Sequence, residues 1–476
     1  MRKLFQNQYI SLGAIILAVF FCASTNCVAL TIEDEKKIGR EFYDKLEQNN
    51  FLLKDRQLND YVTQIGNLVL RQSRKAPFDF TFSIVDSSAI NAFATPGGYI
   101  YIHKGLINAV SNEAELAGVI AHEIAHANAR HIASIMAKAK KLNLAALAAI
   151  IAGAFLGEGA EASAAIAAFS MAGASTMTLK YLREHEEEAD RLGISYLTGA
   201  GYCPSATVSF LKLIKKHEFL SKSVPSYFRT HPGTDERIFY LDGLVLTKYP
   251  ETKVTSIVGN LERMKALIPL GPNELNARHI QLTARLAENP TDVDLLYALA
   301  LTENKMGQTD SALRRLKKAL DISPLDRDVL KYTGIFYLKK GNARQARPYL
   351  QSASELTQDN DDELTLALGK ANFALGNYLT ALHNYLKVQD EPLDDVGINY
   401  HIAMAYGKLN NSGESHYHFG LHFKKENKTQ SALFHFKEAV KHLPAGSARA
   451  VSANKEIEEL TAKTAPAKPP PAAGKN

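Results

Sequence analysis

The sequence predicts a mixed α+β domain followed by an all-helical repeat domain, and three observations lead to this prediction. Alternation of apolar and polar residues indicates short strands in the first part of the chain, among several expected helices. Strand signals end near residue 269, and beyond that point a period of about 34 residues runs through the sequence. The composition, 46% hydrophobic and 22% charged over 476 residues, excludes a largely disordered chain or a polytopic membrane protein.

Residues 1–29 are predicted to be a secretory signal peptide. Met1-Arg2-Lys3 is a short basic start, and residues 10–23 form the apolar stretch that such signals carry. Cys27-Val28-Ala29 places small residues where a signal peptidase requires them, so cleavage is expected before Leu30. The apolar stretch is a little long for a signal, and an uncleaved anchor helix is therefore the alternative.

Net charge and cysteine content narrow the function classes. The formal net charge is +5, and removal of the signal peptide, with its two basic residues, would leave about +3. Proteins that bind nucleic acid carry clustered Lys and Arg on one face, so this mild excess excludes that class. Cys203 would be the one cysteine left after cleavage, so the exported protein is expected to have no intrachain disulfide.

Residues 30–268 are expected to form the α+β domain. Thr31, followed by three acidic residues, marks the start of its first helix. Residues 78–84 alternate between apolar and polar side chains and indicate a strand, and residues 99–102 indicate a second strand after a glycine pair. Asn112 followed by Glu115 has the spacing of a capping box, which predicts a long helix from there to about Lys141.

The repeat domain is expected over residues 273–460, after the Pro269–Pro272 boundary. Its period fits the tetratricopeptide pattern, in which small residues let paired helices approach and large residues fill the gaps between pairs. The first unit places Leu299, Ala300, Gly307, Ala312, Leu316, Ala319 and Pro324 on that pattern. The pattern recurs around Gly334, Gly369 and Gly420, which favours an all-α tetratricopeptide solenoid over an ordinary helical bundle. Residues 461–476, rich in Pro, Ala and Lys, are expected to be a disordered tail.

The chemistry of the first domain is indicated by His122-Glu123-Ile124-Ala125-His126, an HExxH motif inside the predicted long helix. Residues four apart share a helix face, so His122 and His126 can both bind one Zn²⁺ ion. Glu123 would lie beside the metal and take a proton from its bound water, whose pKa zinc lowers toward 7. The alternative is a surface helix with two solvated histidines.

A zinc site of this type needs a third protein ligand and an open fourth position. Residues 182–197 supply the candidates Glu184, His185, Glu186, Glu187, Glu188 and Asp190. A helix through this segment puts Glu186 and Asp190 on one face, so Glu186 can bind zinc while Asp190 accepts the free ring N–H of a ligand histidine. Taken alone, such an acidic run is more often a solvated helix face.

These motifs resemble the gluzincin metallopeptidases, the family that includes the HtpX membrane protease and the CAAX prenyl endopeptidases. The HExxH motif, the ExxAD motif at residues 186–190, and the stretches 91–94, 96–98 and 105–107 carry the resemblance, which covers about residues 30–248. It implies a zincin-like fold with one Zn²⁺ per chain, held by His122, His126 and Glu186. It further implies that Glu123 is catalytic and that Asp190 supports a ligand.

The resemblance also implies features that the motifs alone do not establish. Tyr99, Ile100, Tyr101 and Ile102 would be an edge strand that pairs with an extended substrate. His231, in Arg229-Thr230-His231-Pro232, would be a fourth ligand or would stabilise the oxyanion. The combination with tetratricopeptide repeats implies a periplasmic protein, either soluble or peripheral to the outer membrane. Its clients would be unfolded or stalled envelope proteins, and its partner the β-barrel assembly machinery.

Two apolar, alanine-rich segments, Leu142–Leu156 and Ala162–Met177, are each shorter than the roughly twenty residues a membrane span needs. They are expected to form a packed hairpin over the active site or a lid that touches a membrane surface.

The sequence as a whole predicts an exported zinc endopeptidase whose repeats recruit clients or an assembly machine. The alternative is a chaperone or assembly adaptor whose protease is latched.

Overall fold

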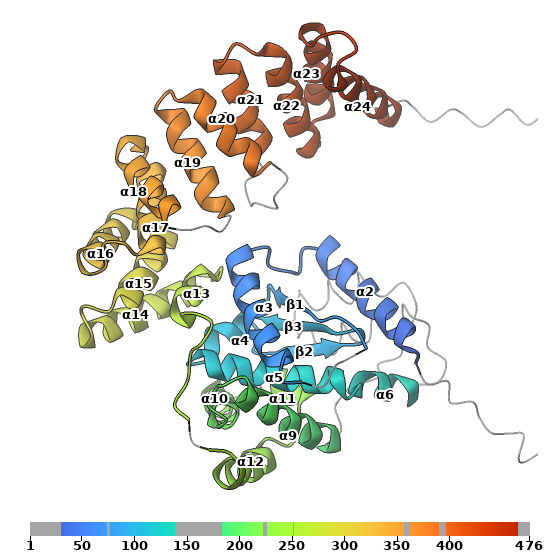
Figure 1. Ribbon diagram of the computed structural model, residues 1–476, viewed down its shortest axis with the longest axis vertical. Coiled ribbons are helices and arrows are strands. Elements are labelled where there is room, and N and C mark those ends of the chain that lie inside the picture. Colours follow the sequence, from blue (N-terminus) through green and yellow to red (C-terminus); the bar gives the residue numbers. More distant parts are fainter. Residues whose placement is uncertain are drawn as a thin grey trace, which may run out of the picture. The chain divides into compact units, whose positions relative to one another are not determined.

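The computed structural model describes residues 30–73, 77–138, 183–221, 226–250, 252–356, 361–389 and 397–464 (Figure 1). The chain divides into two compact units, Met1–Met264 and Lys265–Asn476. The predicted signal peptide, the predicted hairpin at 142–177 and residues 465–476 lie outside the described residues. Across the described ranges, none of the helices is both long and apolar enough to span a membrane.

The first unit is the expected α+β domain, a small sheet with helices around it. Its strands are β1 (Thr81–Val85), β2 (Ala92–Thr95) and β3 (Tyr99–His103). Its helices are α2 (Ile32–Gln48), α3 (Arg56–Leu70), α4 (Lys104–Ala109), α5 (Glu113–Asn128), α6 (His131–Lys138), α9 (Arg183–Gly199), α10 (Ser205–Ser221), α11 (Ser226–Thr230) and α12 (Thr234–Lys248). Helix α2 begins with a complete capping box between Thr31 and Asp34, as the acidic start of the segment predicts.

The sheet has the order β1-β3-β2, with β3 parallel to β1 and antiparallel to β2. The expectation that Tyr99–Ile102 forms an edge strand is therefore wrong, because β3 lies in the centre with a hydrogen-bonded neighbour on each side. Gly97 and Gly98, both at positive φ (84° and 87°), make the tight turn that returns the chain from β2 into β3. Strand β1 then pairs with the other side of β3 and leaves β2 as an outer strand among the described residues.

Helix α5 lies between the sheet and a helical layer that includes α9 and α10 (Figure 1). Every residue from Glu113 to Ala127 is buried, as expected for a helix that packs on all sides. Helix α9 comes close to α5 at Gly193, where an added Cβ would lie 3.1 Å from the His122 Cα. This close approach brings the two predicted ligand segments together.

The long helix expected from Asn112 to Lys141 is broken. Helix α5 ends at Asn128, and a second helix, α6, begins at His131. Arg130 between them has a φ of 55°, in the left-handed region that a regular helix never enters. Its guanidinium donates hydrogen bonds to the Glu35 carboxylate and to the Leu30 carbonyl, and these bonds stabilise the change of chain direction at Arg130.

The first turn of α5 is tied to the chain segment that follows α12. The buried Glu113 carboxylate accepts hydrogen bonds from the Tyr61 and Tyr202 hydroxyls at 2.9 and 2.6 Å. It also accepts the backbone N–H groups of Ile257, Val258 and Gly259 at 2.6, 2.8 and 2.9 Å. Residues 257–259 are followed in the chain by α13 (Leu261–Leu267), and the division between the two units falls within this helix.

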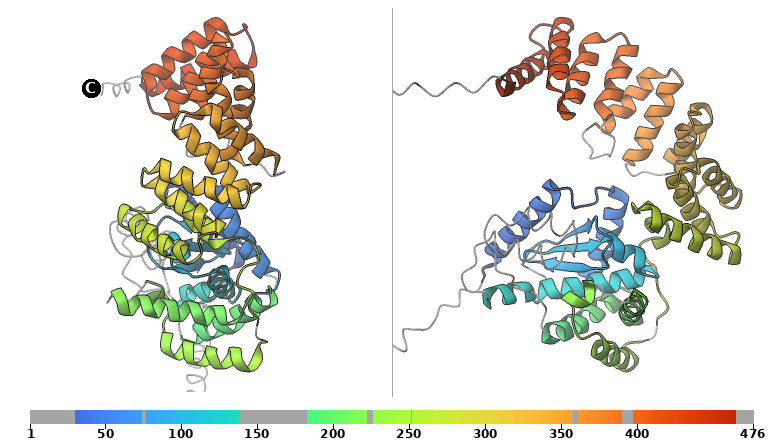
Figure 2. Two further views of the ribbon diagram at one scale, coloured as in Figure 1. Left: turned by 90° about the vertical axis from the view of Figure 1, so that its left-hand side faces the viewer. Right: turned by 180° about the vertical axis from the view of Figure 1, so that it is seen from behind.

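The second unit is entirely helical in its described residues and contains the predicted repeat pairs (Figure 2). Its helices are α14 (Pro272–Glu288), α15 (Val293–Lys305), α16 (Thr309–Ile322), α17 (Arg327–Lys339), α18 (Ala343–Glu355), α19 (Asp362–Ala374), α20 (Tyr378–Lys387), α21 (Ile398–Lys408), α22 (Ser412–Lys425), α23 (Thr429–His442) and α24 (Ala448–Thr464). Because α24 continues to Thr464, the expectation of a disordered tail from residue 461 is wrong for residues 461–464.

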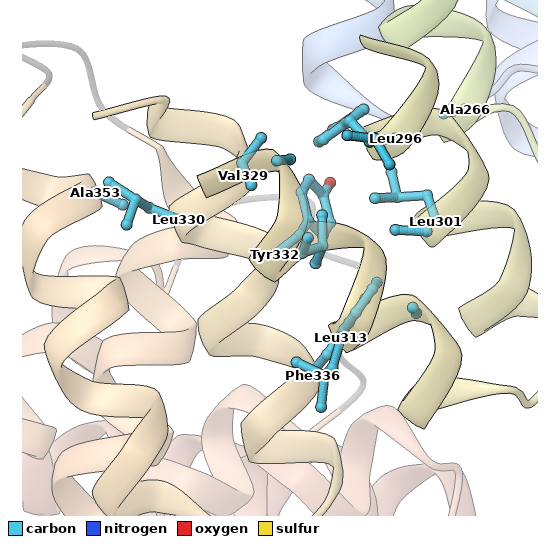
Figure 3. Close-up of a cluster of buried hydrophobic side chains, with 14 of the residues drawn as sticks. Ala266, Leu296, Leu301, Leu313, Val329, Leu330, Tyr332, Phe336 and Ala353 are labelled. Carbon is cyan, nitrogen blue, oxygen red and sulfur yellow. The ribbon is translucent and has the colours of Figure 1, made fainter. Parts of the chain in front are cut away.

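Turns of one kind join the two helices within each pair. Each has a residue at positive φ, and these residues are Gly307, Gly341, Gly376, Asn410 and Asn427. The last two flank α22, so that helix closes one pair with α21 and opens the next with α23. Leu296, Leu313 and Phe336 belong to the apolar core between successive pairs (Figure 3).

The division between the units falls ahead of the expected Pro269–Pro272 boundary. Ala266 already belongs to the apolar core of the repeats (Figure 3). The Lys305 ammonium donates hydrogen bonds to the carbonyls of Ala266, Leu267 and Ile268 at 2.7, 2.9 and 2.8 Å. These hydrogen bonds hold the C-terminal end of α13 against the end of α15.

Candidate metal centre

The predicted ligands come from three separate segments of the first unit. His122 and His126 lie on the buried helix α5, and Glu186 lies on α9. His231 follows α11, and its backbone N–H donates to the Tyr227 carbonyl at 2.8 Å. Its ring stacks on that of Tyr227 with a centroid separation of 4.5 Å. Helix packing thus assembles a site from residues more than a hundred positions apart.

Side chains of His122, His126, Glu186 and His231 converge, each offering one ligand atom within 4.8 Å of the others. The Nε2 atoms of His122 and His126 are 2.9 Å apart. The two Glu186 oxygens lie 3.4 Å from His126 Nε2 and 3.5 Å from His122 Nε2. All four residues are at most 2% exposed. Such a group of nitrogen and carboxylate donors is suited to a divalent transition metal.

His231 occupies the side of this group that faces Glu123. Its Nδ1 atom lies 3.1 Å from Glu186 Oε1 and 3.4 Å from His122 Nε2. Its Nε2 atom lies 3.5 Å from Glu123 Oε1. His231 therefore stands where a fourth ligand would stand, between the other donors and the candidate base.

The Glu123 carboxylate is fully buried, and neither of its oxygens has a hydrogen-bond partner among the described residues. Burial raises the pKa of Glu123, because desolvation disfavours the charged form. An unpartnered buried carboxylate costs stability unless a cation or a water molecule meets it. Its position beside the four donors fits that of a base that acts on a metal-bound water.

Asp190 orients the first histidine of the motif. Its Oδ1 atom lies 3.0 Å from His122 Nδ1, the ring nitrogen that faces away from the cluster. Arg237 binds Asp190 through two hydrogen bonds of 2.7 and 2.8 Å, and the Tyr240 hydroxyl donates to the same carboxylate. Burial opposes the ionisation of Asp190, but Arg237 and His122 hold its pKa below the usual range.

Buried charge is a further sign that the residues fit a metal. Glu123, Glu186 and Asp190 are three buried acids, and Arg237 is the one buried guanidinium among the described residues that contacts this group. Burial opposes ionisation of Glu186, yet Arg237 and His231 hold its pKa well below the usual range. With neutral histidines, as metal binding requires, and all three acids ionised, Arg237 compensates one negative charge and a divalent cation would balance the other two.

The other candidates in the acidic run lie outside the cluster of ligand atoms. Glu187 pairs with Arg191 on the surface of α9 at 2.8 Å. Glu188 and His185 both contact His131, which lies behind His126. Strand β3, predicted to pair with substrate, is covered on both sides by β1 and β2.

Sequence reasoning missed three residues that support the site. Arg237 and Tyr240 lie on α12, and no motif in the sequence links them to α9 before the helices are packed. The predicted continuous helix turns His131 away from His126, so it gives no reason to link the two residues. The nearest signal for it is the unusual density of histidines around residues 122–131.

Two models of known families match the chain, one over each unit. Residues 56–245 match the model of peptidase family M48, and residues 276–415 match a tetratricopeptide repeat model. By these matches the chain combines a region similar to the M48 peptidases with tetratricopeptide repeats, and the expected fold class, α+β followed by a helical repeat solenoid, is confirmed.

Relatives of this chain include bacterial proteins named beta-barrel assembly-enhancing protease. The beta-barrel assembly-enhancing protease of Escherichia coli (strain K12) is 26% identical over 389 residues, which cover 73% of this chain and 78% of that protein. The Yersinia pestis protein of the same name is 33% identical over 212 residues. A Vibrio cholerae protein that carries the name provisionally is 37% identical over 212 residues. The chain spans 43% of the length of the last two relatives and 44% of its own length is matched to them.

More distant likenesses are found as well. The mitochondrial metalloendopeptidase OMA1 of Arabidopsis thaliana is 30% identical over 154 residues, which cover 32% of this chain and 29% of that protein. Among solved structures, a tetratricopeptide repeat protein from Parabacteroides merdae is 14% identical. The matched region covers 53% of this chain and 98% of that protein, with a TM-score of 0.30.

Proposed function

We propose that the protein is a periplasmic zinc endopeptidase that cleaves misfolded or stalled envelope proteins, and that its repeats recruit clients or the β-barrel assembly machinery. One observation carries the catalytic part: two histidines and a glutamate converge beside a buried carboxylate that has no hydrogen-bond partner in the described part of the chain. The family match and the names of the relatives support the reaction class and the setting.

In this proposal His122, His126 and Glu186 hold one Zn²⁺ ion. The bound ion supplies a Lewis acid for the scissile carbonyl and lowers the pKa of a water molecule. Glu123 takes the proton of the attacking water and later delivers it to the leaving amine. Asp190 keeps the Nδ1–H of His122 in place, so that the lone pair of Nε2 is available to bind the metal. Arg237 holds the two carboxylates Asp190 and Glu186 in register.

Strand β2 replaces β3 as the proposed docking edge for an extended substrate. Strand β2 packs against α5, which carries the HExxH motif. The His103 N–H donates to the Asn91 carbonyl, so Asn91 faces β3 and the alternate residues Ala92 and Ala94 direct their backbone groups to the other side. An incoming peptide strand can add to that side by β-augmentation.

His231 favours the second candidate function, a chaperone or assembly adaptor with a latched protease. Its Nδ1 atom lies among the donors of the three proposed ligands, so it fills the position that water or substrate would need. We propose that His231 closes the site at rest and leaves when substrate binds.

The test of this function is a combined measurement on purified protein that starts at Leu30. A crystal of that protein should show an anomalous peak at the zinc edge between His122, His126 and Glu186. The same protein should cleave casein, and a zinc chelator should stop the cleavage. A chain that binds zinc but leaves casein intact would support the latched adaptor, and a chain without zinc would overturn both proposals.

A further inference from the structure

The two histidines of the HExxH motif are held in the same way, although their partners differ. Each directs Nε2 into the cluster and Nδ1 away from it. His122 Nδ1 faces Asp190 Oδ1 at 3.0 Å, a partner that the sequence predicted. His126 Nδ1 faces the Nδ1 atom of His131 at 2.8 Å, a hydrogen-bond distance between two ring nitrogens.

The break between α5 and α6 is what brings His131 to this place. On a regular helix, a residue five positions after His126 lies on a different face. The left-handed conformation of Arg130 turns the chain so that His131 folds back over His126. Two ordered partners, Glu35 and the Leu30 carbonyl, hold the Arg130 side chain, so the reversal is built into the fold.

His131 is itself fixed on its other sides. It is 3% exposed, and its ring stacks on that of His185 with centroids 4.3 Å apart and planes 13° apart. Its Nε2 atom lies 3.2 Å from Glu188 Oε2. The Glu188 carboxylate can only accept when it is ionised, so Nε2 of His131 is the donor of this bond.

We propose that His131 is the positioning residue for His126, with Glu188 behind it. This inference rests on the proposed zinc centre. A metal on His126 Nε2 leaves its proton on Nδ1, which donates to His131 Nδ1. His131 keeps its single proton on Nε2 and donates it to Glu188, so the ring stays neutral and every nitrogen of the pair has one role. The chain His126–His131–Glu188 does for the second ligand what Asp190 does for the first.

The test measures zinc affinity in the full chain starting at Leu30, by competition with a chromophoric chelator, and needs no activity. His131→Leu removes the acceptor and should raise the Kd for zinc about 10- to 100-fold, the usual cost of losing such a partner. His131→Asn should recover most of the affinity, because Oδ1 of asparagine can accept where Nδ1 did. Glu188→Leu should weaken binding less than His131→Leu. His217→Leu, which replaces an exposed histidine on α10, is the matched control and should leave the Kd unchanged.

A second readout separates positioning from simple packing. Cobalt-substituted protein should show an altered visible spectrum in His131→Leu and a nearly normal one in His131→Asn. A residue that only packs would lower the melting temperature of the metal-free chain and leave the Kd and the cobalt spectrum alone, and that result overturns the proposal. Equal weakening by Asn and Leu would also overturn it, because the hydrogen bond would then not be the cause. If the unaltered chain binds no zinc, the metal centre fails, and this inference fails with it.

Discussion

The Arg237 Nη1 atom lies 2.5 Å from Glu186 Oε2, so the carboxylate proposed as third ligand is already held by a buried guanidinium. The same guanidinium binds Asp190, and the pKa of Arg237 is raised well above its usual range by these acids despite its burial. Glu186 therefore stays ionised and fixed before any metal arrives. A ligand set that is arranged in advance loses less conformational entropy when it binds.

Replacing Glu123 by Gln separates catalysis from metal binding. The amide keeps the volume of the side chain but cannot take a proton, so casein hydrolysis should fall at least about 100-fold while one zinc per chain remains. Zinc content by atomic absorption and a casein assay give the two numbers. Glu187→Gln on the surface of α9 is the control and should behave as the unaltered protein does. Retained hydrolysis in Glu123→Gln would refute the proposed base.

Replacing Glu186 by Ala should remove the metal as well as activity. His122, His126 and His231 remain, but His231 is proposed to leave when substrate binds, so two fixed ligands are left where zinc sites in proteins need three or more. The change also leaves Arg237 with one buried partner fewer, which we expect to destabilise the metal-free fold by about 3 kcal/mol. Metal content and thermal melting measure both effects. Full zinc occupancy in Glu186→Ala would show that His231 serves as the third ligand in its place.

His231→Ala tests the proposed latch. His122, His126 and Glu186 remain, so zinc should be retained, while the fourth position becomes open to water and substrate. We expect kcat/KM for casein to rise several-fold. The comparison variant is Tyr227→Leu, which removes the ring on which His231 stacks and should raise activity in the same direction by a smaller factor. A fall in kcat with unchanged zinc would instead assign His231 to the oxyanion.

Removal of the repeats tests whether the two units are separable. A chain that ends at Met264 keeps the sheet, the candidate centre and the Glu113 contacts, so it should melt cooperatively and cleave casein. It should lose co-purification with envelope assembly partners and native clients, since the repeats are proposed to recruit them. Melting with and without a zinc chelator checks the fold. Aggregation of the shortened chain without a transition would contradict the separability of the units.

Motif spacing could indicate which residues share a helix face, because helical periodicity alone places His122 with His126 and Glu186 with Asp190. It could not predict the order of strands in the sheet, since β2 and β3 are alternating or apolar segments of similar length and only their pairing shows which one is outside. It also could not predict the reversal at Arg130, because arginine has no preference for positive φ and is held there by Glu35 and Leu30, far away in the sequence.

The repeat unit should lose stability in mild acid because of His418. Burial, with a smaller effect of Arg449, lowers the pKa of His418 to about 4, against 6.5 in an unfolded chain. Between pH 6.5 and pH 4, the unfolded chain binds more protons at residue 418 than the folded chain does. The free energy of unfolding should therefore fall as the pH drops through this range, in total by roughly 3 kcal/mol. Burial also lowers the pKa values of His416 and His435, which act in the same direction.

Urea unfolding of residues 265–476 at several pH values between 7.5 and 4 measures this effect. His418→Gln should flatten the dependence on pH, whereas His383→Gln, an exposed histidine on α20, should preserve it. An equal slope in the unaltered unit and in His418→Gln would show that other groups govern its acid sensitivity.

The five hydrogen bonds that converge on Glu113 define where this protein can be recombined with others. Three of its donors are the backbone N–H groups of residues 257–259, which belong to the segment leaving the catalytic unit. A chimera joined ahead of Ile257 would remove these three donors and leave the buried Glu113 carboxylate with the Tyr61 and Tyr202 hydroxyls alone. A graft made after Met264 keeps them, so gene fusions that exchange one repeat array for another should be viable only with the junction at that later position.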